Sequence, residues 1–292
     1  MNISIDPIRQ GYDFAGRVRG TDLRQTLRPD EVAAIEKGMD DFGVLVFPGQ
    51  DITDDQQLVF AENFGPIEHT NGTVRSEGER LKNGIADISN LDENNRLLDK
   101  EDRRRIFNLG NFLWHSDSSF RETPARYSML SARAIPSIGG NTEFADMRGA
   151  YDALAPGVKN EIEDLVCEHS LLFSRAQLGF KDFTDEERER FEPVLQRLVR
   201  KHPRTGRRNL YLSAHIGAIK GMPIADALLL LSELTEHATQ REFVYQHHWT
   251  RFDLVMWDNR TTMHRGRKYD ESQPRDLRRF TTMDDGPTVA LR

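Results

Sequence analysis

The stretch Asp253 to Arg260, DLVMWDNR, decides how the rest of the chain is interpreted. Its apolar run Leu254 to Trp257 is too short for a helix, and it is followed directly by the turn-forming residues Asp and Asn. This pattern predicts a buried strand that ends in a turn. Strand-like runs also lie on either side of it, at Val244 to Trp249 and at Arg279 to Met283. The C-terminal part of the chain is therefore expected to be mainly β.

Short strands also dominate the middle of the chain, while helices occur early and as insertions. The expected strands and one hairpin are Gly43 to Gly49 (GVLVFPG), Ala86 to Leu91, Tyr127 to Ala134, Thr142 to Ala145 and the hairpin Leu198 to Ser213. The expected helices are Pro29 to Phe42, a helix that begins at the capping box Thr53 to Gln56 and ends at Gly65, and Pro223 to Ala238. Strands and helices do not alternate regularly, so an antiparallel barrel or a double-sheet jelly roll with helical insertions fits better than a parallel sheet.

Composition excludes several classes of function. The 292 residues include 40 Lys and Arg against 47 Asp and Glu, which gives a net charge of −7. This charge balance lacks the excess of basic residues that is typical of a nucleic-acid-binding protein. The longest aliphatic run, Ala227 to Leu231, is far shorter than the roughly 20 apolar residues of a membrane span. Cys167 is the only cysteine, and the N-terminus does not resemble a secretory signal, so we expect a reducing, cytoplasmic compartment. No linker is evident, and we interpret residues 1–292 as one domain, with a homo-oligomer left open.

Without thiolates, a metal site must be built from imidazole and carboxylate groups. The stretch LWHSDSSF contains His115 and Asp117, whose side chains would point to the same face of a strand. His264 follows the strand at 253–260 and is a suitable third ligand. Two histidines and a carboxylate can form a facial triad that leaves open positions on Fe(II). The alternatives are a capped turn with an exposed Asp117 and a surface His264 in a basic loop.

Two arginines follow His264. Arg275 and Arg279 are four residues apart and would share one face of a strand, so both could reach one cavity. A guanidinium group binds a carboxylate in a bidentate manner, as recognition of 2-oxoglutarate requires. The alternative is that these arginines solvate an exposed strand.

Four motifs in this order carry a family resemblance: HSD (115–117), GGNTEF (139–144), WDNRTTMHR (257–265) and RDLRR (275–279). Together they resemble the taurine dioxygenase / 2,4-dichlorophenoxyacetate dioxygenase family, whose members depend on Fe(II) and 2-oxoglutarate. The similarity is greatest to the 2,4-dichlorophenoxyacetate branch and extends from about Phe42 to Asp285.

The resemblance implies a double-stranded β-helix (jelly-roll, cupin-like) core with helical insertions. It also implies Fe(II), 2-oxoglutarate and O2 as cofactor and co-substrates, and a small acidic molecule as substrate. The matching positions are His115, Asp117 and His264 for the metal, Thr142 and Arg275 for 2-oxoglutarate, and Arg279 and His215 for the substrate, with no catalytic residue beyond the metal ligands. Asn111 is a further candidate contact to the co-substrate, and His215 could instead be a strand histidine at the rim. The loop His69 to Lys82, which often closes over the substrate in this family, does not match well.

The expected reaction is hydroxylation of an aryloxyalkanoate such as 2,4-dichlorophenoxyacetate, giving a phenol, glyoxylate, succinate and CO2. One alternative is oxidation of taurine or another small sulfonate or carboxylate. Another is a different class of protein, either a non-catalytic metal-binding jelly roll or a zinc hydrolase. Thr142 and Arg275 argue against a plain metal binder, because such a protein would not need to hold 2-oxoglutarate.

Overall fold

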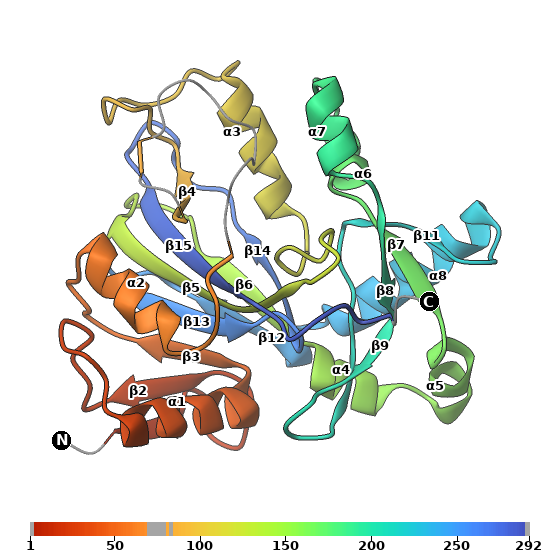
Figure 1. Cartoon of the computed structure of the whole chain (residues 1–292), viewed down its shortest axis with the longest axis horizontal. Helices are drawn as coiled ribbons and strands as arrows, with labels where there is room; N and C mark the ends of the chain where they lie inside the picture. The colour runs from red at the N-terminus through yellow and green to blue at the C-terminus, as the bar shows by residue number, and fades with distance from the viewer. Residues whose placement is uncertain (1–2, 69–79, 82–83, 290–292) are drawn as a thin grey trace.

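Two β-sheets that share one apolar core form the centre of the computed structural model, which describes residues 3–68, 80–81 and 84–289 (Figure 1). Within the larger sheet only β2 and β3 run parallel. Its strands, in spatial order, are β1 (Ser4–Pro7), β2 (Gly16–Arg19), β3 (Val44–Phe47), β13 (Leu254–Asp258), β5 (Ala125–Ala134), β15 (Asp276–Met283) and β4 (Ala86–Ser89). The smaller antiparallel sheet has the order β12 (Val244–His247), β6 (Thr142–Asp146) and β14 (Thr262–Gly266).

The run Leu254 to Trp257 is continuously apolar because β13 is central in the larger sheet and buried on both faces. Leu254 and Met256 pack into the core beneath the N-terminal helices. Val255 and Trp257 point to the opposite face, where Trp257 lies 5.4 Å from Phe144 of the smaller sheet, measured between ring centroids. Alternation along the strand therefore sends successive side chains into two different cores. The fold is the mainly β, double-sheet arrangement expected from the sequence.

Helices α1 (Pro29–Phe42) and α2 (Asp54–Glu62) cover the outer face of the larger sheet, as Figure 1 shows. Helix α1 ends at Gly43, which adopts the left-handed conformation with φ 68°. Helix α2 begins at the expected capping box, in which Thr53 accepts a hydrogen bond from the backbone N–H of Gln56. It ends at Glu62, earlier than the Gly65 expected from the sequence.

The remaining elements are insertions that pack around the smaller sheet and the open end of the core. The helical ones are α3 (Arg103–Asn108), the 3-10 turns η1 (Leu109–Phe112) and η2 (Arg241–Phe243), α4 (Met147–Ala153), α5 (Pro156–Ile162), α6 (Leu171–Ala176), α7 (Asp185–Arg190) and α8 (Ile224–Ala238). The short strands are β7 (Val166–His169), β8 (Val194–Arg197), β9 (Val199–Lys201), β10 (Arg208–Leu210) and β11 (Ile216–Ile219). The pairing of β9 with β10 confirms the expected hairpin, and α8 confirms the expected helix. In the described part of the chain, no helix has the length and apolarity needed to cross a membrane.

Candidate active site

His115, Asp117 and His264 meet at the open end of the core, and all three are buried. One side-chain donor atom from each lies within 4.8 Å of the others. Nε2 of His115 is 3.7 Å from Oδ1 of Asp117, and Nε2 of His264 is 3.7 Å from Oδ2. The alternatives of an exposed Asp117 and a surface His264 are therefore wrong. The arrangement has the donor types and spacing of a two-histidine, one-carboxylate metal site.

The backbone brings the two histidines together in a way that the sequence analysis described only in part. His264 lies on β14, and its backbone N–H and C=O both pair with those of His115. His115, however, forms only an isolated bridge, and Asp117 lies in a turn rather than on a strand. The turn continues through Ser118, which has φ 50°. The bend, and not strand alternation, directs the Asp117 carboxylate to the histidines.

Both histidines are held in the neutral form, and the tautomer of His115 is fixed by a hydrogen bond. The ring of His115 uses Nδ1 to contact the carbonyl oxygen of Leu113 at 2.7 Å, and an oxygen that can only accept fixes the proton on Nδ1 and leaves Nε2 free. Burial lowers the pKa of His115, and burial together with the nearby His115 lowers that of His264 well below its usual value. Neutral imidazoles are the form that binds a metal.

Hydrogen bonds from the WDNR motif hold Asp117 in place. The side-chain oxygen of Asn259 accepts hydrogen bonds from the backbone N–H of Asp117 and from Nε1 of Trp257, both at 3.0 Å. The Asn259 amide donates to Ser128, whose hydroxyl donates to Oδ2 of Asp117 at 2.7 Å. Sequence analysis missed Ser128, because it lies far from the motif in sequence and reaches the site only through the pairing of β5 with β13.

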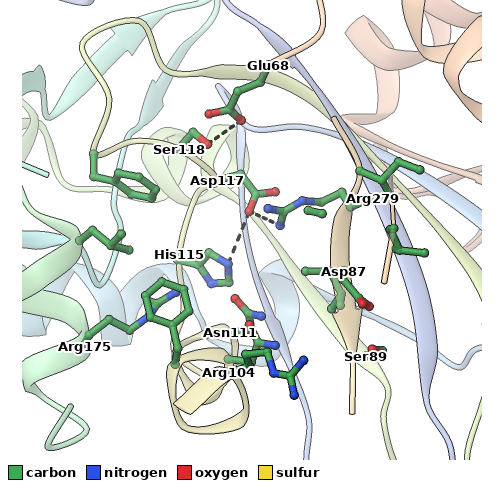
Figure 2. A pocket seen from close by; sticks show the side chains of 18 of the residues that line it. Glu68, Asp87, Ser89, Arg104, Asn111, His115, Asp117, Ser118, Arg175 and Arg279 are labelled. Atoms are coloured by element: carbon green, nitrogen blue, oxygen red, sulfur yellow. Dashed lines mark hydrogen bonds and ion pairs between the residues drawn. The ribbon is translucent and has the colours of Figure 1, made fainter. Parts of the chain in front are cut away.

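Arg279 points from β15 to the triad and pairs with Asp117, with 2.5 Å between Nη1 and Oδ1 (Figure 2). Burial alone would raise the pKa of Asp117, but the charge of Arg279, helped by the two histidines, lowers it to about 2. The carboxylate is therefore ionised at neutral pH.

Two cavities of about 210 and about 70 Å³ meet at this point. Both are lined by His115, Arg279 and Asn111, whereas Asp117 lines only the larger cavity and His264 only the smaller one, so the triad lies between the two cavities. Asn111, a candidate co-substrate contact from the sequence, can therefore face either cavity.

The smaller cavity contains Thr142, Arg275 and His264. Thr142 begins β6, and its hydroxyl oxygen accepts a hydrogen bond from Nε1 of Trp249 at 3.0 Å, which leaves the hydroxyl proton free to donate. Arg275 precedes β15 and is buried, and its side chain donates to the carbonyl of Ile88 at 3.2 Å. Its cation has no carboxylate partner among the described residues, and burial lowers its pKa. An anion of matching shape would complete this cavity.

The larger cavity contains His215 and a residue that the sequence analysis missed, Arg175 on α6. His215 is buried and lies edge-on to Phe120, with ring centroids 4.9 Å apart. Burial, together with nearby Arg175, lowers the pKa of His215 well below its usual value, so the ring is neutral. Much of the remaining wall is apolar and consists of Leu81, Ile85, Ile88, Leu91, Leu98, Phe107, Phe120 and Leu171. Of the loop 69–82 only residues 80 and 81 lie within the described residues, and Arg80 pairs with Asp87 and Asp276.

Comparison with known proteins agrees with this geometry. The family described as taurine catabolism dioxygenase TauD, TfdA matches residues 4–281. The chain belongs to this family. It is 50% identical over 273 residues to the alpha-ketoglutarate-dependent 2,4-dichlorophenoxyacetate dioxygenase of Cupriavidus pinatubonensis, covering 93% of this chain and 95% of the relative. It is 37% identical to the (S)-phenoxypropionate/alpha-ketoglutarate-dioxygenase of Sphingobium herbicidovorans, over 80% of each chain.

A solved structure extends the agreement to three dimensions. The crystal structure of AAD-2 in complex with Mn(II) and N-oxalylglycine superposes with a TM-score of 0.96 at 57% identity, covering 99% of this chain and 100% of AAD-2. These relatives confirm the jelly-roll core and make the chain a 2-oxoglutarate-dependent dioxygenase, an oxidoreductase. They also confirm the expected dependence on a metal ion and 2-oxoglutarate. Membership of this family replaces the alternative of a non-catalytic metal-binding protein.

Proposed function

We propose that this dioxygenase hydroxylates an aryloxyalkanoate such as 2,4-dichlorophenoxyacetate at the carbon next to the ether oxygen. One oxygen atom of O2 enters the substrate and the other enters succinate, as 2-oxoglutarate loses CO2. The hydroxylated product is a hemiacetal that breaks down to a phenol and glyoxylate. The observation that carries the proposal is the pair of cavities that meet at the triad, one lined by Arg275 and Thr142 and the other by a set of apolar side chains beside Arg279.

His115, Asp117 and His264 fit Fe(II), because two neutral imidazoles and one ionised carboxylate converge with their free donor atoms facing one another. Bound Fe(II) would supply the redox chemistry that couples O2 and 2-oxoglutarate to oxidation of a C–H bond. The residues around the triad keep these ligands in the required state: Leu113 fixes the tautomer of His115, and Ser128 and Arg279 hold the Asp117 carboxylate.

In the smaller cavity, we propose that Arg275 and Thr142 bind the distal carboxylate of 2-oxoglutarate. A buried guanidinium with no carboxylate partner among the described residues and a hydroxyl with a free proton would both donate to it. The opposite end of the co-substrate would then lie toward His264, which lines the same cavity.

In the larger cavity, we propose that the substrate's aromatic ring packs against the apolar wall while Arg279 and His215 face its acidic end. Nε of Arg279 is buried and has no hydrogen-bond partner, so it retains a donor for a ligand. A small sulfonate such as taurine would leave the apolar wall without contacts, because it has no ring to bury. The cavity therefore favours an aryloxyalkanoate over the small-sulfonate alternative.

A substrate panel tests the proposal. The protein is incubated with Fe(II), 2-oxoglutarate and O2, and phenol and succinate are measured for aryloxyacetates, aryloxypropionates and taurine. We expect phenol and succinate in a one-to-one ratio with at least one aryloxyalkanoate. Succinate formation stimulated by taurine but not by any aryloxyalkanoate would contradict the proposed substrate while leaving the class of reaction intact.

Four further expectations from the sequence remain predictions. We propose that residues 1–292 act as one dioxygenase domain. Arg279 and His215 remain predicted substrate contacts. The cytoplasmic location rests on the single cysteine, and a homo-oligomer stays open.

A further inference from the structure

The arginines around the two cavities divide into two groups. The lining residues include Arg80, Arg104, Arg105, Arg121, Arg175, Arg275 and Arg279. Five of these form ion pairs with carboxylates: Arg80, Arg104, Arg105, Arg121 and Arg279. Within the described residues, no carboxylate pairs with Arg275 or with Arg175. Each cavity therefore contains one buried arginine whose charge is not balanced by the protein.

Arg175 is 6% exposed, and its surroundings leave part of its guanidinium free. Nη1 donates to Ser174 at 3.2 Å, whereas Nε is buried and has no hydrogen-bond partner. The group lies over the ring of Phe107, with 4.5 Å between Cζ and the ring centroid. Figure 2 shows the side chain extending from α6 toward His115. A buried cation with an unused donor is costly to keep, and proteins rarely retain one without a ligand or a partner.

Gly110 makes room for this arrangement. A Cβ atom at position 110 would lie 2.2 Å from both Cζ and Nη1 of Arg175, which is closer than any real contact. The glycine on η1 therefore permits the guanidinium to reach this position, and any larger residue would displace it.

The neighbouring His215 cannot provide the positive charge itself. The hydroxyl of Ser174 donates to the carbonyl of Leu171, so it must accept from Nδ1 of His215, which is 2.8 Å away. A neutral ring with its proton on Nδ1 has only an acceptor left at Nε2, and an acceptor does not bind a carboxylate. Arg175 donates to the same hydroxyl, so Ser174 holds both side chains in place.

We propose that Arg175 binds the carboxylate of the aryloxyalkanoate and is a specificity-determining residue for acidic substrates. The inference rests on the proposed function and deepens it. Arg275 and Arg175 then play matching roles, since each is a buried arginine that lacks a protein carboxylate and completes its pair with a ligand. His215 lies beside the substrate but contributes no positive charge. Arg279 uses Nη1 to pair with Asp117 and keeps Nε as a donor for a ligand.

Two ligands that differ only in charge, a carboxylate and its neutral amide, test the inference. The protein is loaded with Mn(II) and N-oxalylglycine, and binding of 2,4-dichlorophenoxyacetate and of its neutral amide is measured by calorimetry. In the Arg175→Met variant, affinity for the carboxylate should fall roughly 10- to 100-fold, because a charge-assisted contact is lost. Affinity for the amide should change by less than about threefold, because the apolar wall is intact.

Two further variants separate a ligand contact from a structural one. Gly110→Ala keeps the guanidinium but displaces it, and it should reduce the carboxylate-to-amide affinity ratio in the same direction as Arg175→Met. Arg104→Met removes an arginine from the same cavity whose charge is already paired with Asp102, and it should leave that ratio unchanged. In the absence of ligand, the Tm of Arg175→Met should be unchanged or raised, because an unbalanced buried cation is removed.

The outcomes are distinguishable. An unchanged carboxylate-to-amide ratio in Arg175→Met, with normal binding by the wild-type protein, would overturn the role of Arg175 and leave the proposed function standing. A lowered Tm together with an equal loss of both ligands would identify Arg175 as a structural residue, which also overturns it. Failure of the wild-type protein to bind or convert any aryloxyalkanoate would instead refute the proposed function.

Discussion

The two cavities are built from different parts of the fold. The smaller cavity is lined by residues of both central sheets, including Leu130 of β5, Thr142 of β6, Trp257 of β13 and His264 of β14, and is closed on one side by α3 and η1. The larger cavity is lined by the edge strand β4 and by Arg279 of β15, and otherwise by insertions, among them α3 and α6. We therefore expect binding of the metal and the co-substrate to depend mainly on the sheets, and recognition of the substrate to depend more on the insertions.

This difference shows how one fold can keep a reaction while changing its substrate. Thr142 and His264 lie on strands that ladder hydrogen bonds hold, and His115 is tied to His264 by backbone hydrogen bonds, so this part of the site keeps its geometry. Helices and loops outside the sheets can vary without disturbing those strands. Substitutions on the two sides should therefore have separable kinetic effects, and the following predictions test that separation.

Asp117→Ala should have the largest effect, because Asp117 is the carboxylate of the proposed metal site and lies between the two histidines. Loss of its carboxylate removes one of the three proposed ligands and leaves Arg279 beside the two histidines without its partner. We expect turnover to fall by at least about a thousandfold, with succinate and phenol lost together. Metal content and both products are measured, and far-UV circular dichroism checks the fold. An Asp117→Ala protein with normal Fe(II)-dependent activity would remove Asp117 from the metal site.

Arg275→Met should affect only the smaller cavity. The loss of a buried cation that would pair with the distal carboxylate should raise the KM for 2-oxoglutarate roughly 100-fold. The ratio of affinities for an aryloxyacetate and its amide should not change, because Arg275 does not line the larger cavity. Steady-state kinetics with each ligand varied in turn provide the measurement. Equal changes in both KM values would show that the cavities are not independent.

The sequence could predict the smaller cavity but little of the larger one, and the reason is physical. The motifs that contain His264, Thr142 and Arg275 carry the family resemblance that implied their roles, and strand spacing placed Arg275 on the same face as Arg279. Arg175 lies on a six-residue helix in an insertion, and its importance comes from packing over Gly110 and from lacking a carboxylate partner among the described residues. Neither property is visible without the fold. The bend at Ser118, which replaces the expected strand, is equally hidden, because a non-glycine residue with positive φ has no reliable sequence signal.

Leu98→Ser should have a moderate effect confined to the substrate. Leu98 lies on the apolar wall of the larger cavity, and a partly buried leucine contributes about 1 kcal/mol of contact with an aromatic ligand. We expect the KM for the aryloxyacetate to rise roughly fivefold, with the KM for 2-oxoglutarate unchanged. The adjacent Leu97 is 41% exposed and lines neither cavity, so Leu97→Ser is a matched control. A similar rise in both variants would mean that the wall is not where the ring binds.

Cys167→Ala should have the smallest effect and provides the baseline for the comparison. Cys167 lies on β7 in the core cluster beneath α8 and lines neither cavity. Burial raises the pKa of its thiol to about 12, so the group is a neutral apolar side chain at physiological pH. Its removal should cost about 1 kcal/mol of unfolding free energy, while both KM values and the phenol-to-succinate ratio stay the same. Urea unfolding and the kinetic assay measure the two quantities on one preparation. Loss of activity without loss of stability would show that the insertion carrying β7 communicates with the active site, and the separation between core and insertions would then be incomplete.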